Sequence, residues 1–119
     1  MIVSRDAGEQ VGWWDEDFFW YGEDLDFCYR LREHGWEIYF VPQFSTLHYK
    51  GTSGGLKKES QKISTASKET KLRATNARFD AMKIFYKKHY VNKYPKIATS
   101  LVFLGIEAKK LITKRQLGL

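Results

Sequence analysis

With 119 residues, the chain is long enough for one small domain with a modest core. Hydrophobic residues make up 43% of it and aromatic residues 16%, which excludes an intrinsically disordered chain. The single cysteine, Cys28, excludes an internal disulfide and a cysteine-based zinc site.

The net charge of +6 is distributed unevenly along the chain. Residues 1–50 carry 4 Lys or Arg and 10 Asp or Glu, a balance of −6, whereas residues 51–119 carry 16 and 4, a balance of +12. An acidic front half and a basic back half indicate two different roles. The alternative for the back half is that its exposed helices are simply rich in lysine.

The first expected elements are short. Residues 1–3 are predicted to end a strand, and residues 5–11 to form a short helix or turn closed by Gly12. The stretch 13–21 is both aromatic and acidic and has neither a clean helical nor a clean strand period. We therefore expect an ordered loop there, ended by Gly22.

A helix is predicted over residues 23–34. Leu25, Cys28 and Leu31 recur at helical spacing and form its apolar stripe, and its first residues are acidic, as the helix dipole favours. Gly35 is placed to end the helix in the left-handed conformation.

A strand buried on both faces is predicted next, because residues 36–41 form a near-continuous apolar run stopped by Pro42. Residues 44–49 suit a second short strand, and the glycines of 51–55 a flexible break. Two basic helices are then expected, over residues 57–90 and 96–115.

One ordered set of motifs runs from residue 12 to residue 48. It reads Gly-Trp-Trp-Asp-Glu-Asp-Phe-Phe-Trp-Tyr-Gly-Glu-Asp-Leu-Asp-Phe-Cys-Tyr-Arg-Leu-Arg, then Gly35-Trp36, Tyr39-Phe40-Val41-Pro42 and His48. This set resembles the second half of the catalytic domain of family 2 glycosyltransferases, especially the bacterial rhamnosyltransferase-like group. One departure is Trp13, where the family often has a small residue.

The resemblance implies an α/β fold of the GT-A type, a mixed sheet between helices. Residues 1–55 would be its C-terminal, acceptor-side part, and residues 56–119 a basic helical extension. In the family, the first half of the domain holds the nucleotide-sugar site and an Asp-x-Asp metal motif. The two Asp-x-Asp matches of this chain, 15–17 and 24–26, both lie inside the acceptor-side pattern. We therefore expect the nucleotide half to be absent, and the exposed strand to favour self-association.

The resemblance assigns the catalytic base to Asp24, the second residue of the Glu-Asp pair. An inverting transfer replaces the nucleoside diphosphate by an acceptor hydroxyl, and one base takes the hydroxyl proton. The local alternative is that Asp24 only caps the helix. Asp26 leaves the helix about 200° away from Asp24, so a salt bridge to Arg30 is expected for it instead.

The residues around the base are assigned to the acceptor. Glu23 is predicted to orient it or to support the loop, and Trp20 and Tyr21 are predicted to stack against its sugar rings, with core packing as the alternative for the aromatic pair. Asp15 is expected to hold the aromatic loop through hydrogen bonds.

A divalent metal, Mg²⁺ or Mn²⁺, is implied by the resemblance, since the diphosphate leaving group needs its charge stabilised. Some family members use a histidine at the position of His48 to complete the metal site or to touch the diphosphate. The alternative is a structural histidine.

Residues 97–106 are the most apolar segment, and lysines flank them. The segment is shorter than the roughly 20 apolar residues that span a bilayer. It suits an interfacial membrane anchor, and the alternative is a helix that packs on the missing half.

These patterns predict part of an inverting glycosyltransferase of cell-surface polysaccharide synthesis, inactive alone. Its partners would be a nucleotide-sugar donor, through the missing half, and a glycan or lipid-linked acceptor. No signal peptide is expected, so we place the protein in the cytoplasm, peripherally at the inner face of the membrane. A non-catalytic docking module for a membrane or partner is the alternative. Nucleic-acid binding is not favoured, because no recognition motif accompanies the basic charge.

Overall fold

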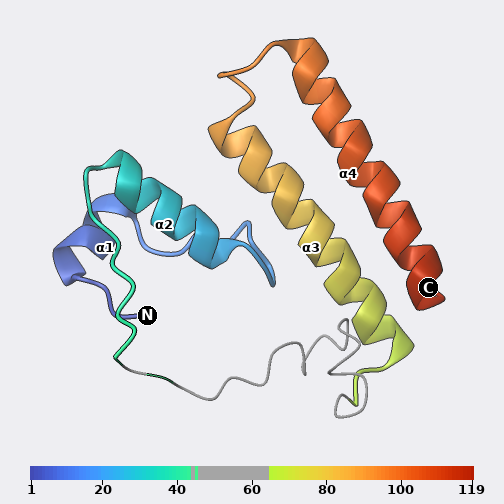
Figure 1. Ribbon diagram of the computed structural model, residues 1–119, viewed down its shortest axis with the longest axis horizontal. Coiled ribbons are helices and arrows are strands. Elements are labelled where there is room, and N and C mark those ends of the chain that lie inside the picture. The colour runs from blue at the N-terminus through green and yellow to red at the C-terminus, as the bar shows by residue number, and fades with distance from the viewer. Residues whose placement is uncertain (44, 46–64) are drawn as a thin grey trace.

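The computed structural model of the chain describes residues 1–43, 45 and 65–119, which hold four α-helices. The short helices α1 (Arg5–Val11) and α2 (Glu23–Glu33) pack on each other, and the long helices α3 (Lys68–His89) and α4 (Lys96–Leu117) form a second pair. Figure 1 shows the two pairs beside one another, with α2 directed at α3.

The core between α1 and α2 is small and apolar. It is built from Ala7, Phe27 and Leu31, with Val3, Val11 and Trp36 partly buried around it. Phe27 and Leu31 are one helical turn apart and therefore share a face of α2. The predicted stripe was right for Leu31 but wrong for Leu25, which is exposed. The helix turns its Phe27 side to α1 instead.

Both short helices end as predicted, in a left-handed glycine. Gly12 follows α1 with φ 78°, and Gly35 follows α2 with φ 85°. In each case the next residue, a tryptophan, donates its backbone N–H to a carbonyl five residues back: Trp13 to Gly8 at 2.9 Å and Trp36 to Leu31 at 3.0 Å. This is the Schellman arrangement. The Trp13 ring then lies against Gly8 of its own helix, and the Trp36 ring packs on the core between the two helices.

The N-terminal end of α2 approaches α3 closely at Gly22. This residue has φ 91°, a backbone conformation that residues other than glycine rarely adopt. A Cβ atom at Gly22 would also lie 3.1 Å from the ring of Phe18 and 3.4 Å from the Cβ of Ala81 in α3. Glycine therefore allows the start of α2, with its acidic residues, to lie against the middle of α3.

Helix α3 begins at Lys68, where the Ser67 hydroxyl caps it by accepting the Thr70 N–H at 3.1 Å. Residues 65–67 are not helical, so the continuous helix expected from residue 57 was wrong. A serine that accepts a backbone N–H three residues later competes with helix on its N-terminal side. Residues 57–64 themselves lie outside the described ranges.

Helices α3 and α4 run antiparallel as a hairpin. The ring of Tyr86 meets that of Phe103 edge-on, with centroids 5.6 Å apart. Lys83 pairs with Glu107, and the Lys110 amine lies 3.1 Å from the Asp80 carboxylate. The helix predicted over residues 96–115 is confirmed and extends to Leu117. Lysines of the basic half therefore serve partly as ion-pair partners within the chain.

The strand predicted over residues 36–41 was wrong. These residues form no strand, and Tyr39 and Phe40 are 76% and 90% exposed. A strand needs neighbours to accept its backbone hydrogen bonds, and the structure describes none in this chain. The expected strand end at residues 1–3 is absent for the same reason.

The second expected strand and the glycine-rich break lie outside the described residues, apart from Ser45. The α/β fold class is accordingly not confirmed in the part of the chain that the structure covers, which is helical.

Gly8 provides a test of the packing between α1 and its tryptophan cap. A Cβ atom there would lie 2.5 Å from the Trp13 ring, so Gly8→Ala should push the ring away from the core. We expect a loss of about 1–3 kcal/mol in the free energy of unfolding, as for an overpacked core. Gly105→Ala is the control, because it meets nothing within 4 Å and should stabilise α4 slightly. Urea denaturation followed by circular dichroism measures both, and equal effects of the two substitutions would contradict the proposed contact.

Candidate active site at the start of α2

A buried carboxylate, Asp26, joins α2 to the end of α3. Its side chain is 0% exposed. His89 Nε2 lies 2.7 Å from Asp26 Oδ1, and Lys88 Nζ lies 3.0 Å from Oδ2. Arg30 Nε donates to the same Oδ2 at 2.7 Å, which confirms the predicted salt bridge one turn along α2. Each carboxylate oxygen therefore has a partner, as a buried charge requires.

Two opposing effects act on the pKa of Asp26. Burial, the larger single effect, raises it, but hydrogen bonds from His89, Arg30 and Lys88 together outweigh burial and hold the pKa below its usual value. The carboxylate is therefore charged at neutral pH, and it works as the centre of a polar cluster.

Arg30 extends this cluster to the rest of the front half. One guanidinium nitrogen donates to the carbonyl of Val11 at the end of α1, and the other to the carbonyl of Trp13 at 2.5 Å. The guanidinium also lies over the ring of Phe27, 5.6 Å from its centroid. Arg30 thus holds the start of the aromatic loop against α2.

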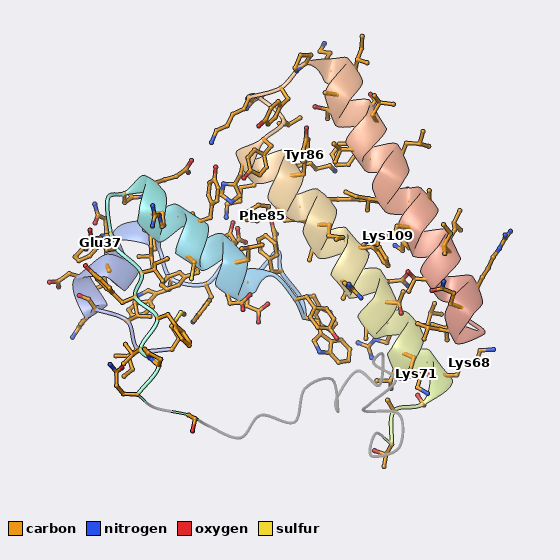
Figure 2. All side chains as sticks on the ribbon, viewed as in Figure 1. Glu37, Lys68, Lys71, Phe85, Tyr86 and Lys109 are labelled. Atoms are coloured by element: carbon orange, nitrogen blue, oxygen red, sulfur yellow. The ribbon has the colours of Figure 1, made fainter. Side chains whose placement is uncertain are left out.

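Aromatic rings pack around the polar cluster between α2 and α3. The ring of Tyr29 lies 4.2 Å from that of His89 and 5.5 Å from that of Phe85, measured between centroids. Figure 2 shows Phe85 between α2 and α3, and Tyr86 on the side of α4. Lys93, beyond α3, donates to the Tyr29 hydroxyl at 2.9 Å and to Glu33 at 3.1 Å. The orientation of α2 on α3 is therefore fixed along its length.

The predicted base, Asp24, lies on the opposite side of α2 from Asp26. Asp24 is exposed, and its Oδ1 accepts the backbone N–H of Leu25 at 2.8 Å. The residue that caps the helix is Gly22, and no side chain caps it there. Asp24 is thus presented to solvent in the first turn, oriented by one backbone amide.

Glu23 precedes Asp24 and is half-buried. One of its carboxylate oxygens, Oε2, is inaccessible to solvent and has no hydrogen-bond partner among the described residues. A buried carboxylate oxygen without a partner is costly, and this marks Glu23 as a side chain able to receive a donor.

The aromatic residues predicted to bind the acceptor lie next to this carboxylate pair. The rings of Trp20 and Tyr21 stack nearly parallel, 6.1 Å apart, and both residues are half-buried. Tyr21 also borders an apolar recess of about 290 Å³ between the start of α2 and the α3–α4 hairpin. The recess is lined by Tyr21, Gly22, Leu25, Arg78, Ala81, Met82, Phe85, Tyr86, Tyr90 and Ile106.

Asp15 holds the aromatic loop, as predicted. It accepts the backbone N–H of Asp17 at 2.9 Å and pairs with Lys88. The hydrogen bond from Lys88 is the main reason that the pKa of Asp15 is lowered. Lys88 therefore bridges the loop and the buried Asp26.

The predicted metal ligand, His48, lies outside the described residues. The histidine, cysteine and carboxylate side chains that the structure does place form no group of three able to hold a metal ion. Asp26 is engaged by three cationic or imidazole partners. The described part of the chain does not fit a metal site by itself.

Lys88 and His89, which join α3 to Asp26, and Arg78, which lines the recess, were not predicted as site residues from the sequence. One signal was available for His89. It follows Phe85 by four residues on the same helical face, the spacing of a buried position. Nothing local indicated that Asp26, 63 residues away, is its partner.

Comparison with known proteins places the described site inside a family match. The family model "Glycosyl transferase family group 2" matches residues 1–92, which include α1 to α3. The chain is 44% identical over 55 residues to the N-acetylglucosaminyl-diphospho-decaprenol L-rhamnosyltransferase of Mycobacterium tuberculosis, covering 46% of this chain and 18% of that protein. It is 40% identical over 49 residues to Rhamnosyltransferase WbbL of Escherichia coli K12, covering 41% and 19%.

A third relative is an archaeal enzyme, the low-salt glycan biosynthesis hexosyltransferase Agl10 of Haloferax volcanii. It is 42% identical over 38 residues, covering 32% of this chain and 12% of that protein. The matched part is thus less than a fifth of the length of each of these relatives. No solved structure matches the chain.

Replacing Asp26 tests the importance of the buried cluster. Asp26→Asn keeps the shape but leaves the positive charges of Arg30 and Lys88 without their buried partner. We expect the free energy of unfolding to fall by about 3–5 kcal/mol, the usual cost of breaking a buried ion pair. Glu16→Gln, an exposed loop residue, is the control and should change it by less than about 0.5 kcal/mol. Urea denaturation is the measurement.

The same variant has a pH signature. Because the pKa of Asp26 is lower in the folded chain than in the unfolded one, its contribution is complete above the unfolded pKa, about 3.9. It is lost as the pH falls through the folded pKa. The free energy of unfolding should therefore fall less steeply with decreasing pH in Asp26→Asn than in the wild type. Parallel stability–pH curves of the two proteins below that pH would contradict a lowered pKa for Asp26 in the folded chain.

Proposed function

The chain belongs to glycosyl transferase family group 2, and from this premise we propose that it forms the acceptor side of an inverting glycosyltransferase. The reaction would move a sugar from a nucleotide-sugar donor to a glycan or lipid-linked acceptor in cell-surface polysaccharide synthesis. The observation that carries the proposal is the opposite placement of two carboxylates in one helical turn: Asp26 is locked in the interior, and Asp24 is open to solvent.

Asp24 would act as the base that takes the proton of the acceptor hydroxyl as the new glycosidic bond forms. Its position in the first turn of α2 gives it a backbone N–H at 2.8 Å, which limits the orientations of the carboxylate. The buried cluster around Asp26 fixes α2 on α3, so it fixes Asp24 as well. Positioning of this kind supports catalysis because reacting groups need to be held close together.

The acceptor would lie over Trp20, Tyr21 and Glu23. Stacked aromatic rings offer a flat apolar surface for the face of a sugar ring, and the Glu23 carboxylate, one oxygen of which has no hydrogen-bond partner among the described residues, would accept a hydrogen bond from an acceptor hydroxyl. The recess next to Tyr21 is lined mostly by apolar and aromatic side chains, with Arg78 as its charged residue. The mycobacterial relative is named for a diphospho-decaprenol acceptor, and this supports a lipid-linked acceptor for the present chain.

The donor side of the reaction is proposed to come from elsewhere. Family resemblance implies a divalent metal that stabilises the leaving diphosphate, and we retain His48 as the candidate contribution of this chain to it. The described side chains form no metal site by themselves, so further ligands would have to come from the donor half.

A non-catalytic docking module is the second candidate function. It is favoured by α4, whose outward face is apolar and exposed and which lies beyond the family match that ends at residue 92.

Asp24→Asn in the complete transferase tests the base. The amide keeps the size of the carboxylate but accepts no proton, so kcat should fall on the order of 10²–10⁴-fold. Affinity for the sugar nucleotide should be unchanged, because the donor would bind the other half. Initial rates with saturating donor measure the effect.

Glu16→Gln is the matched control for this experiment, since it removes an exposed carboxylate from the neighbouring loop and should leave kcat unchanged. Near-normal turnover of Asp24→Asn, or an equal loss in both variants, would refute Asp24 as the base.

The chain by itself should not bind sugar nucleotides. The nucleotide pocket is proposed to lie in the donor half, so this chain alone should have no affinity for the donor. It should also transfer no sugar, because the advantage of holding two reactants together, on the order of 7–11 kcal/mol, is lost. Calorimetric titration with common sugar nucleotides and Mn²⁺ should give no binding heat, with a complete family member as the positive control. Micromolar affinity of the chain alone would overturn the proposed division between two halves.

A further inference from the structure

Helix α4 carries apolar residues on two opposite faces. One face packs on α3 through residues such as Phe103. The other face points away from α3, and its large apolar side chains are between 56% and 78% exposed: Ile97, Leu101, Leu104, Leu111 and Ile112. We call these five residues, with Ala108 between them, the outer stripe. They recur every three or four residues and so form one continuous surface along the helix.

The outer stripe is bordered by positive charge. Lys96, Lys109, Lys114 and Arg115 lie on α4 and form no ion pair with the rest of the described chain. The only carboxylate of α4, Glu107, is paired with Lys83 of α3. The stripe is therefore an apolar band bordered by cations, and α4 itself has no unpaired carboxylate to neutralise them.

We propose that the outer stripe of α4 docks on an anionic phospholipid surface, with the helix in the plane of the interface. Apolar side chains would enter the boundary between headgroups and acyl chains, while the lysines and Arg115 meet the lipid phosphates. No helix in the part of the chain that the structure describes is long and apolar enough to cross a bilayer. From Ile97 to Ile112 the stripe extends about 22 Å at 1.5 Å per residue, enough for a surface contact.

Charge complementarity decides between a lipid surface and a second copy of the chain. Two outer stripes packed on each other would gather the unpaired cations of both copies at one contact, with no free carboxylate on α4 to balance them. Like charges at a contact oppose association. An anionic membrane supplies both the apolar phase and the opposite charge.

This inference is independent of the proposed transferase activity, since its test measures lipid binding alone. The whole chain is sedimented with vesicles of phosphatidylcholine or of phosphatidylcholine mixed with phosphatidylglycerol, at low and at high salt. We expect binding to the anionic vesicles at low salt and weaker binding at high salt or without the anionic lipid. Recovery in the supernatant under all conditions, or equal binding to both kinds of vesicle, would overturn the proposal.

Substitutions on exposed positions keep the fold and remove the stripe. Leu101→Glu with Leu104→Glu should lower the vesicle partition coefficient by roughly tenfold or more. The reason is that the variant loses the free energy gained when two leucine side chains transfer from water into the membrane interface. Ile2→Glu with Phe40→Glu adds the same charge at two fully exposed apolar residues away from α4 and should bind more tightly than the stripe variant. Equal binding by the two double variants would show that the stripe is not the docking surface.

Sedimentation velocity without lipid tests whether the outer stripe binds a second copy of the chain instead of a membrane. A wild-type chain that self-associates, and whose association is abolished by Leu101→Glu with Leu104→Glu, would identify a second copy as the occupant and overturn the lipid assignment. Circular dichroism confirms that each variant remains helical.

Discussion

The arrangement of this chain depends on one buried carboxylate and on the cations that surround it. Asp26 has no solvent contact, and it can remain charged only because Arg30, Lys88 and His89 all reach it. Arg30 lies on α2, whereas Lys88 and His89 lie at the end of α3, so the charge of Asp26 is stable only when α2 and α3 are together. Arg30 then connects the cluster to the end of α1. Three elements whose apolar core is small are thereby held in one orientation by polar contacts.

This dependence gives physical meaning to the Glu-Asp-x-Asp motif. Two positions along a helix rotate a side chain about 200°, so the motif sends its last carboxylate inward and its middle one outward. The inner one, Asp26, fixes α2 against α3, and the outer one, Asp24, is left in solvent. A single motif thus supplies both an anchor and an exposed acidic group. Gly22 complements it, because its left-handed backbone lets the start of the helix lie against Ala81.

Local interactions were predictable from the sequence, and distant ones were not. The helix over Glu23–Glu33, its glycine end at Gly35 and the ion pair between Asp26 and Arg30 all depend on residues a few positions apart, where periodicity and capping act. The strand at residues 36–41 was wrong because an apolar run only becomes a strand when other strands pair with it. The partnership of Asp26 with His89 joins residues 63 positions apart, and composition carries no information about such pairs. The roles of Glu23 and Asp24 were suggested by family resemblance and remain predictions.

Among the lysines and arginines of the basic half, some form ion pairs with other segments, and others on α4 remain unpaired within the described residues. Lys83, Lys88 and Lys110 each pair with a carboxylate of another segment, so they contribute to the packing of the helices. The cations that remain unpaired within the described chain on α4 border its outer stripe instead. A helix that is apolar on two faces needs a second apolar environment in addition to its neighbour. Because the unpaired charges lie beside the face that lacks a neighbour, the net charge of the chain and its exposed apolar surface point to the same anionic interface.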